Sequence, residues 1–335
     1  MRSWLRRLRR VFNAASSPRK PSRPRLAVEP LEERSLLATG FLQTNLVSSI
    51  PGLAAFTDAQ LVNPWGLSAS GNSDVWVSDN QTGFSTLYDG QGVKAGLIVT
   101  IPNAPHSAFT HATPTGTVFN TDPDPNDFVL TNGSKTGPAI FLFDSLDGTI
   151  SGWIGQKTTS AVDAPISIPG AIFTGLAMDT AADATASNGD TLLYAADWGK
   201  GTVDVFNGSF QQVDKGSFQD KAIPKTFRPF NVQDINGNVW VTYAQFDRST
   251  GADTGTGGFV AEFTRDGVLE RTIKSQGWMN SPWGLAMAPA SFGDFGGDLL
   301  VGNFGDGTIS AFDPHNGNFL GQLSDAAGKP ITNEN

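Results

Sequence analysis

Residues 281–317 read SPWGLAMAPASFGDFGGDLLVGNFGDGTISAFDPHNG and form one complete repeat unit. Within it, three runs of strand length, 285–288, 299–301 and 308–312, are rich in apolar or β-branched residues. Gly, Asp, Asn or Pro bounds each run, and these residues typically end strands and make turns. The stretch therefore predicts a meander of antiparallel strands.

The same unit recurs upstream, and five copies are visible. Its opening returns as NPWGL at 63–67, with weaker forms near 114, 173 and 228. The spacing is roughly 50 to 60 residues, close to the longer periods of propeller blades. We therefore predict an all-β fold, a six-bladed β-propeller. Its blades are expected at about 61–103, 111–158, 171–222, 227–275 and 281–325.

Ring closure is predicted from the ends of the body, residues 40–335. Residues 41–50, FLQTNLVSSI, read as one strand without a hairpin partner. Such a strand is expected to complete the last blade and so to remove two free sheet edges. Five copies and this strand leave three strands unaccounted for, so the sixth blade is expected to be incomplete. A chain with such unpaired edges is expected to aggregate or to melt early.

The composition is that of a turn-rich β protein. The 335 residues include 38 Gly and 20 Pro, and only 16% are charged. There is no Cys, which excludes disulfides and thiolate metal sites. No apolar run reaches the length of about 18 residues that suggests a membrane-spanning helix, so we predict no transmembrane segment.

The charge is divided between the N-terminal segment and the rest of the chain. Residues 1–40 contain ten Lys or Arg and three Glu, whereas the remainder contains thirteen basic and twenty-nine acidic residues. An acidic body argues against nucleic acid and anionic membranes as partners.

The first 25 residues are basic, contain no acid and lack the apolar core of a secretory signal peptide. Taken alone they predict a disordered basic tail. Residues 25–37, RLAVEPLEERSLL, resemble the LEPR-XLL-type N-terminal motif of large bacterial surface and exported proteins. On that resemblance we expect residues 1–39 to be a disordered targeting segment. The protein is then expected to be exported, to the extracellular space, the periplasm or the cell surface.

From Phe41 on, the sequence resembles an uncharacterised family of exported bacterial proteins, some of which carry PEP-CTERM sorting tails. The points of match are QTNLVS at 43–48, LVNPWGL at 61–67, RPFNV at 228–232 and SPWGLA at 281–286. The wider rhythm of Pro-x-Gly, Val-x-Asp and Phe-Asp-x-x-Gly is similar to NHL-type six-bladed propellers. That group contains scaffolds, lyases and metal-dependent lactonases. The resemblance implies a fold, and it supplies no catalytic residues.

No catalytic constellation is evident. The three histidines, His106, His111 and His315, fall in links or turns, and their spacing matches no metal pattern. There is also no Gly-x-Ser-x-Gly elbow for a nucleophilic serine. We therefore assign no catalytic residue.

One acidic loop resembles part of a calcium site. Asp122, Asp124 and Asn126 occupy positions 1, 3 and 5 of an EF-hand-like loop. Position 6 is Asp127 where Gly is needed, and position 12 is Gly133 instead of Glu. The loop is thus not an EF-hand. Two interpretations stay open, a solvated acidic hairpin, which we favour, and a low-affinity Ca²⁺ site.

A candidate ligand site is predicted on one face of the ring. The loop entering the first strand of a blade and the loop leaving its second strand lie side by side near the axis. These loops hold polar and aromatic groups suited to a small molecule, a glycan or a protein. The candidates are Asn63, Trp65, Asp79, Asn80, Asn132, Asp197, Trp198, Arg228, Asn231, Trp283, Asn303 and Phe304.

Two interpretations of these residues remain. Asp79, Asn132, Asp197 and Asn303 also suit turns in which the side chain bonds its own backbone. Arg228 is not explained in that way, since a long cation placed where other blades carry small or polar residues indicates an anionic group.

The sequence supports two functional hypotheses from different classes. The first is an exported or cell-surface binding module with an unknown ligand. The alternative is a metal-dependent propeller hydrolase or lyase, lactonase-like, with a divalent ion on the axial face. A purely structural role is the third.

Overall fold

The computed structural model describes residues 40–333 except 106, 180–190 and 214–217. The chain divides into two units, residues 1–37 and the body of residues 38–335. The predicted targeting segment 1–39, with its LEPR-XLL-type stretch, lies outside the described residues.

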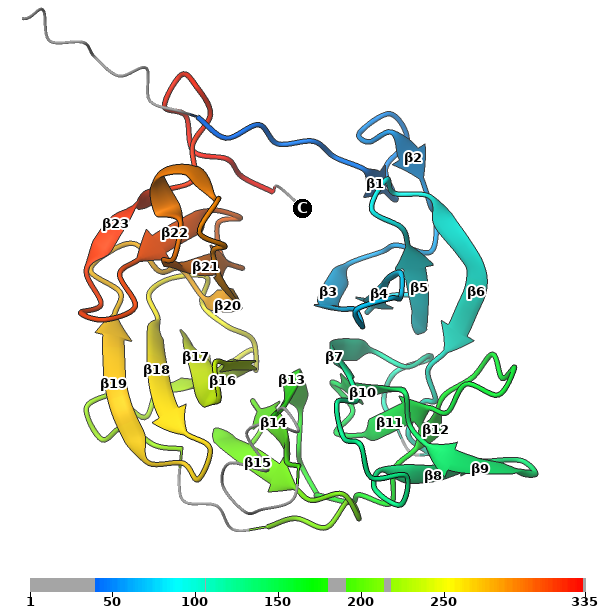
Figure 1. Cartoon of the computed structure of the whole chain (residues 1–335). Helices are drawn as coiled ribbons and strands as arrows, with labels where there is room; N and C mark the ends of the chain where they lie inside the picture. Colours follow the sequence, from blue (N-terminus) through cyan, green and yellow to red (C-terminus); the bar gives the residue numbers. More distant parts are fainter. Residues whose placement is uncertain (1–39, 106, 180–190, 214–217, 334–335) are drawn as a thin grey trace, which may run out of the picture. The chain divides into compact units, whose positions relative to one another are not determined.

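The body is an all-β propeller, as predicted, and its described residues contain no α-helix. Five sheets follow one another around a ring in chain order (Figure 1). The only helical element described is the short 3₁₀ turn η1 (Gly293–Phe295). Six blades were predicted, and the described residues form five. No helix among them is long and apolar enough to span a membrane.

In each blade the strands pair antiparallel and in chain order from the axis outward. Blade one comprises β3 (Pro64–Ser68), β4 (Val75–Asp79), β5 (Phe84–Tyr88) and β6 (Lys94–Thr100). Blade two comprises β7 (Pro114–Phe119), β10 (Phe141–Ser145), β11 (Ile150–Trp153) and β12 (Val162–Asp163). Blade three comprises, among the described residues, β13 (Phe173–Met178), β14 (Leu193–Asp197) and β15 (Thr202–Phe206).

The last two blades are complete four-stranded sheets. Blade four comprises β16 (Phe227–Ile235), β17 (Asn238–Gln245), β18 (Phe259–Thr264) and β19 (Leu269–Lys274). Blade five comprises β20 (Pro282–Met287), β21 (Leu299–Asn303), β22 (Ile309–Phe312) and β23 (Phe319–Gln322).

The hydrophobic core lies between neighbouring blades. Trp76 of blade one stacks on Phe141 of blade two with ring centroids 4.1 Å apart, and both are buried. Trp240 of blade four packs in the same way in a cluster with Leu299 and Val301 of blade five. Burying such large apolar side chains against the next sheet is what holds adjacent blades together.

A glycine in the inner strand lets neighbouring blades approach closely. A Cβ added at Gly66 would lie 2.5 Å from the carbonyl oxygen of Thr115, and one at Gly116 would lie 2.4 Å from the nitrogen of Leu176. The corresponding Gly284 of blade five is different, because the nearest atom to its added Cβ is 3.6 Å away and belongs to the same blade. The side of blade five that points away from blade four is therefore open at this point.

Blade two differs from the sequence prediction in its second strand. The run 128–132 forms β8 (Val129–Asn132), which pairs only with β9 (Lys135–Pro138) as a hairpin inserted between β7 and β10. The second strand of the blade is β10 instead. The apolar run is buried at a different place from the blade strands. Phe128 is fully buried, and its ring lies 5.4 Å from that of Phe210, which follows the last described strand of blade three.

The predicted closing strand 41–50 also differs. Only β1 (Val47–Ser48) is extended into a ladder, and it pairs in parallel with β2 (Phe56–Thr57). After a turn at Gly52, where φ is +84°, the chain loops round to run parallel to β1, so β1 pairs with the strap's own β2 and not with a strand of blade five. The segment 40–58, here called the strap, crosses from blade five to blade one (Figure 1).

Candidate functional site

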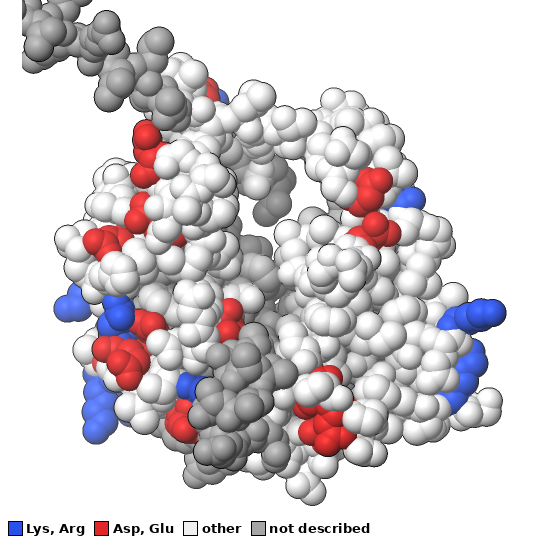
Figure 2. All heavy atoms as spheres, viewed as in Figure 1, with Lys and Arg blue, Asp and Glu red and all other residues white. Residues whose placement is uncertain are grey.

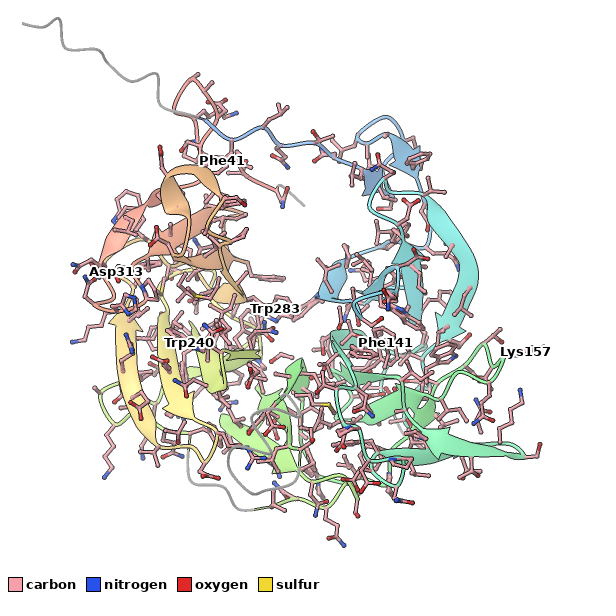
Figure 3. All side chains as sticks on the ribbon, viewed as in Figure 1. Phe41, Phe141, Lys157, Trp240, Trp283 and Asp313 are labelled. Carbon is pink, nitrogen blue, oxygen red and sulfur yellow. The ribbon has the colours of Figure 1, made fainter. Side chains whose placement is uncertain are left out.

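Four of the predicted site residues meet in one aromatic cluster. We define the axial aromatic cluster as Trp65, Trp198, Phe230, Trp283 and Phe304, which come from blades one, three, four and five. Trp65 lies 5.7 Å from Trp283, 5.2 Å from Phe304 and 6.0 Å from Phe230 between ring centroids. Figure 3 shows Trp283 pointing from β20 into the middle of the ring. The rings pack mainly edge to face, the arrangement that aromatic pairs prefer.

The axial aromatic cluster is tied across the ring by hydrogen bonds. The indole of Trp283 donates to the carbonyl oxygen of Thr174 in blade three at 2.8 Å. The side-chain amide of Asn231 in blade four donates to the carbonyl oxygen of Trp283, also at 2.8 Å. The first bond joins blades five and three, which are not neighbours in sequence, and the second joins the consecutive blades four and five. They use polar groups that a ligand at the axis would otherwise engage.

A small axial cavity remains beneath these rings. Its volume is about 170 Å³, and it is lined by Trp65, Gly66, Leu67, Gly116, Thr117, Leu176, Asn231, Gln233, Trp283, Gly284 and Leu285. This volume is below the range of about 300 to 1,000 Å³ typical of small-molecule sites. Figure 2 shows that most Lys and Arg side chains visible on the face it presents lie toward the outer margin of the body.

Four further predicted residues hold loops together. Asn63 donates to the amide oxygen of Asn80 at 3.2 Å, and Asn80 donates to the carbonyl oxygen of Pro114 at the start of β7. Asp197 accepts from the backbone of Ile172 and of Lys200. Asn303 donates to the hydroxyl of Thr308, at 2.9 Å, and accepts from a backbone amide. Only the bond from the backbone of Lys200 to Asp197 is the local kind that the turn interpretation predicts, and the others join loops that lie 17 or more residues apart or link two side chains.

Asp79 belongs to a buried network within blade one. It accepts from the hydroxyl of Thr86 at 2.8 Å, and the Thr86 hydroxyl also contacts that of Tyr88. Tyr88 donates to Asp58 at 2.6 Å, and Asp58 pairs with Lys94. Burial raises the pKa of Asp79 to about 7, and the nearby charge of Asp58 adds to the effect, while the Thr86 bond opposes it. Asp79 is therefore partly protonated at neutral pH.

The predicted Asn132 lies away from the axis. Because β8 is part of an inserted hairpin, Asn132 bonds the backbone and the hydroxyl of Ser160. The residue of blade two that matches Asp79 in register is Ser145. Its neighbour Asp144 is fully buried, accepts from Thr115 at 2.7 Å, and has its pKa raised to about 6 chiefly by burial. Sequence reasoning missed Asp144 because it counted the hairpin as the second strand.

The acidic loop considered for Ca²⁺ bonds its own backbone. Asp122 accepts from the nitrogen of Asp124, and Asp124 accepts from the nitrogen of Asn126, at 2.8 and 2.9 Å. Short polar side chains make successive turns of this kind. The loop is not a hairpin, because it joins β7 to β8, and these two strands do not pair with each other. Among the described residues no group of three or more His, Asp or Glu is arranged to hold a metal ion.

A second candidate site, larger than the axial cavity, lies between blades three and four, and we call it the lateral cavity. Its volume is about 470 Å³, within the small-molecule range. Buried Phe218, Ile223, Pro229 and Tyr243 contribute apolar surface to it. It is lined by Lys200, Gly201, Thr202, Phe218, Gln219, Asp220, Lys221, Ile223, Pro224, Lys225, Phe227, Arg228, Pro229, Tyr243 and Arg248.

The lateral cavity contains the predicted Arg228, whose side chain is held on two sides. Its carbon Cζ lies 3.5 Å from the centroid of the Phe246 ring. One nitrogen, Nη1, donates to the carbonyl oxygens of Trp198 and Gly199, both at 2.9 Å. Burial lowers the pKa of this guanidinium, and so does the nearby positive charge of Arg248.

Sequence reasoning missed the other cations of this cavity, Lys200, Lys221, Lys225 and Arg248. A signal was present, because residues 200–248 contain six of the thirteen Lys and Arg found beyond residue 40. These cations come from three separate loops, so no local motif joined them. Only the packing of blade three against blade four brings them together.

The comparisons with known proteins identify viral relatives. No family model matches the sequence. The chain is 34% identical over 298 residues to uncharacterized protein R648 of Acanthamoeba polyphaga mimivirus, covering 85% of this chain and 70% of the viral protein. It is 30% identical over 323 residues to uncharacterized protein L690 of the same virus, covering 91% of this chain and 79% of the viral protein. The chain belongs to the family of these mimivirus proteins.

This finding corrects the predicted relationship to an exported bacterial family. The relatives found are viral, and no family model supports a PEP-CTERM tail or a LEPR-XLL motif. Two of the four matching segments, LVNPWGL and SPWGLA, are the start of the inner strand in blades one and five. A motif that repeats within one chain reflects blade geometry, and it is a poor marker of one family.

Among solved structures, the fold is similar to a streptogramin B lyase, with a TM-score of 0.49 and 13% identity over 78% of this chain and 68% of that one. For a virginiamycin B lyase from Staphylococcus aureus the TM-score is 0.48 and the identity 10%, over 78% of this chain and 70% of the lyase. For a gluconolactonase from Xanthomonas campestris the TM-score is 0.39 and the identity 19%, over 55% of this chain and 57% of the gluconolactonase. At such identities no activity passes from these enzymes to this chain.

Proposed function

We propose that this chain is a β-propeller binding module that takes a small ligand in the lateral cavity. The observation that carries the proposal is the cavity itself. Its volume of about 470 Å³ suits a small molecule, its surface is partly apolar, and its polar groups converge from three loops. Such a combination of apolar surface and a few convergent polar groups is typical of ligand sites.

The axial face is the less favoured location. Its aromatic side chains are in contact with one another, and the amide of Asn231 and the indole of Trp283 bond backbone carbonyls. A ligand would have to displace these contacts. The alternative of a metal-dependent hydrolase or lyase would need a cluster of carboxylates or imidazoles, and the described residues offer no group of three.

The ring is proposed to have six positions, of which five are filled by blades. Two inner strands support this count. Leu67 of β3 is 66% exposed, and Gly284 of β20 has open space where the other inner-strand glycines abut the next blade. Both features are expected of strands that flank an unfilled position. Export remains a prediction, which was made from the resemblance of residues 25–37 to an N-terminal motif that no family model supports, and cell fractionation would test it.

A cavity-filling variant tests the site. In a thermal-shift screen of mixed neutral and charged metabolites, at least one ligand should raise the melting temperature of the wild-type protein. The variant Thr202→Trp places bulk in the lateral cavity and keeps its five cations, so it should abolish this shift. Thr136→Trp, on the exposed hairpin of blade two, is the matched control. Shifts that survive Thr202→Trp but disappear in Trp283→Ala would place the site at the axis and contradict the proposal.

A further inference from the structure

We propose that the ligand of the lateral cavity is a small anion, a sugar-sized molecule that carries a phosphate, sulfate or carboxylate group. The inference rests on the proposed function and names the chemical class of its ligand. Five cationic side chains line this one cavity, Lys200, Lys221, Lys225, Arg228 and Arg248. They are five of the thirteen Lys and Arg in a body with twenty-nine acidic residues. A chain with an excess of acid thus gathers more than a third of its cations around one space.

The cations of the lateral cavity form no ion pairs with neighbouring carboxylates. Within the described part of the chain, none of the five has an Asp or Glu oxygen at ion-pair distance. Asp197 attracts Arg228 and Lys200 only from a longer range, and the one acid in the lining, Asp220, is engaged elsewhere, since it accepts from Thr272 at 2.6 Å. Five like charges with this partial compensation repel one another, and a bound anion would relieve that repulsion.

Arg228 is preorganised for such a ligand. The ring of Phe246 supports its guanidinium from one side, and the carbonyls of Trp198 and Gly199 fix Nη1. Nε and Nη2 make no hydrogen bond to any described residue. A guanidinium held in place with donors to spare is the group that recognises a planar or tetrahedral oxyanion.

The other cations differ from Arg228 in their freedom. Lys200, Lys221, Lys225 and Arg248 are exposed, and their long side chains can turn toward the cavity or away from it. We expect Arg228 to fix the anionic group and the exposed cations to supply attraction that depends on salt. The apolar surface of Tyr243 and Phe218 would then contact the neutral part of the ligand.

Matched sugars test the charge requirement. Glucose 6-phosphate, glucose 6-sulfate and glucuronate differ from glucose mainly by one anionic group, so calorimetric titration of all four separates charge from shape. At least one of the three anions should bind at millimolar concentration or below, and glucose should not. Raising the salt concentration should weaken binding. Comparing the three anions identifies the preferred group.

Charge-removing variants test the location. Arg248→Gln and Lys225→Gln should each weaken anion binding about five- to tenfold, as expected when one charge-assisted contact is lost. Both residues are exposed, so folding should be unaffected. Lys157→Gln, an equally exposed lysine of blade two, should change nothing (Figure 3).

Two results would overturn the inference. If none of the three anions bound, or if Lys157→Gln weakened binding as much as Arg248→Gln, the lateral cavity would not be an anion site. If a neutral ligand bound, was lost in Thr202→Trp and was insensitive to Arg248→Gln, the proposed function would stand and only the anionic class would be wrong.

Discussion

At the scale of single residues, buried carboxyl groups are the feature with a measurable consequence. Asp79 is fully buried, only one of its two oxygens has a hydrogen-bond partner among the described residues, and its pKa is raised to about 7. An unfolded chain ionises such a group near pH 3.9. The folded protein therefore holds the proton more tightly than the unfolded chain, and the group contributes stability below pH 4 that is lost as the pH rises toward 7.

The variant Asp79→Asn isolates this effect. It mimics the protonated side chain at every pH, so it should remove the part of the pH dependence that comes from Asp79. The difference in unfolding free energy between variant and wild type should shift in favour of the variant by about 4 kcal/mol between pH 4 and pH 8. Urea denaturation at a series of pH values measures it.

The exposed Asp124→Asn serves as the control for this series. Its difference from the wild type should stay nearly constant with pH. Asp144 and Asp204, whose pKa values burial also raises to about 6, are present in all three proteins and cancel in the comparison. If the difference in unfolding free energy between Asp79→Asn and the wild type did not change between pH 4 and pH 8, ionising Asp79 would cost the folded state no stability.

At the scale of strands, the inner-strand glycines set how closely blades pack. Gly116→Ala should destabilise the protein by about 1 to 3 kcal/mol, because its Cβ would overlap the backbone nitrogen of Leu176, which cannot move away alone. Gly284→Ala is the matched control, since its Cβ would have 3.6 Å of room. Neither glycine has a positive φ, so backbone strain does not enter. Chemical denaturation of both variants gives the two values.

An equal cost for the two glycine substitutions would contradict this account. It would mean that the inner strand of blade five is covered in solution as closely as that of blade two. The proposal of an unfilled sixth position would then also lose one of its two supports.

Much of the strand pattern could be predicted from the sequence, since strand-length runs between turn residues define a blade locally. The closing strand 41–50 was one exception, and β8, whose run is as apolar as a blade strand, was another. Period and composition cannot tell a strand that pairs at the second position from one that forms an added hairpin. That choice depends on where Phe128 finds a partner, and its partner Phe210 lies far along the chain.

The candidate site was predicted only in part, for a related reason. Trp65, Trp198 and Trp283 were predicted to converge because the loop entering the first strand of a blade and the loop leaving its second strand lie side by side near the axis, and the structure brings them together. The residues that line the lateral cavity do not occupy equivalent positions in successive blades. Its cations stand in loops of different length, so their meeting depends on how blade three packs against blade four. Arg228 was singled out because it departs from the repeat. The direction in which its side chain points could not be predicted from the sequence.

At the scale of the whole body, ring closure depends on the strap. Blade one and blade five are the two blades with only one blade as a neighbour, and the strap contacts both. At one end, Phe41 stacks on Phe292 with centroids 5.0 Å apart, and its backbone nitrogen donates to Ser324 at 2.8 Å. At the other end, Asp58 bonds Tyr88 and Lys94. Mainly side-chain contacts therefore join blade five to blade one, the role that was predicted for a closing strand.

Phe41→Ala should loosen this closure, because it removes the stacking on Phe292 and Phe295 while leaving every blade intact. We expect a loss of about 1 to 2 kcal/mol, less than for a fully buried Phe, since Phe41 is half-buried. Hydrogen exchange should become faster in residues 41–48 and in η1, and it should stay unchanged in blades two to four. The neighbouring Leu42 is 92% exposed, so Leu42→Ala should alter neither quantity. If Phe41→Ala left the exchange of residues 41–48 unchanged, the strap would be held by its backbone bonds alone, and the ring would not depend on this aromatic contact.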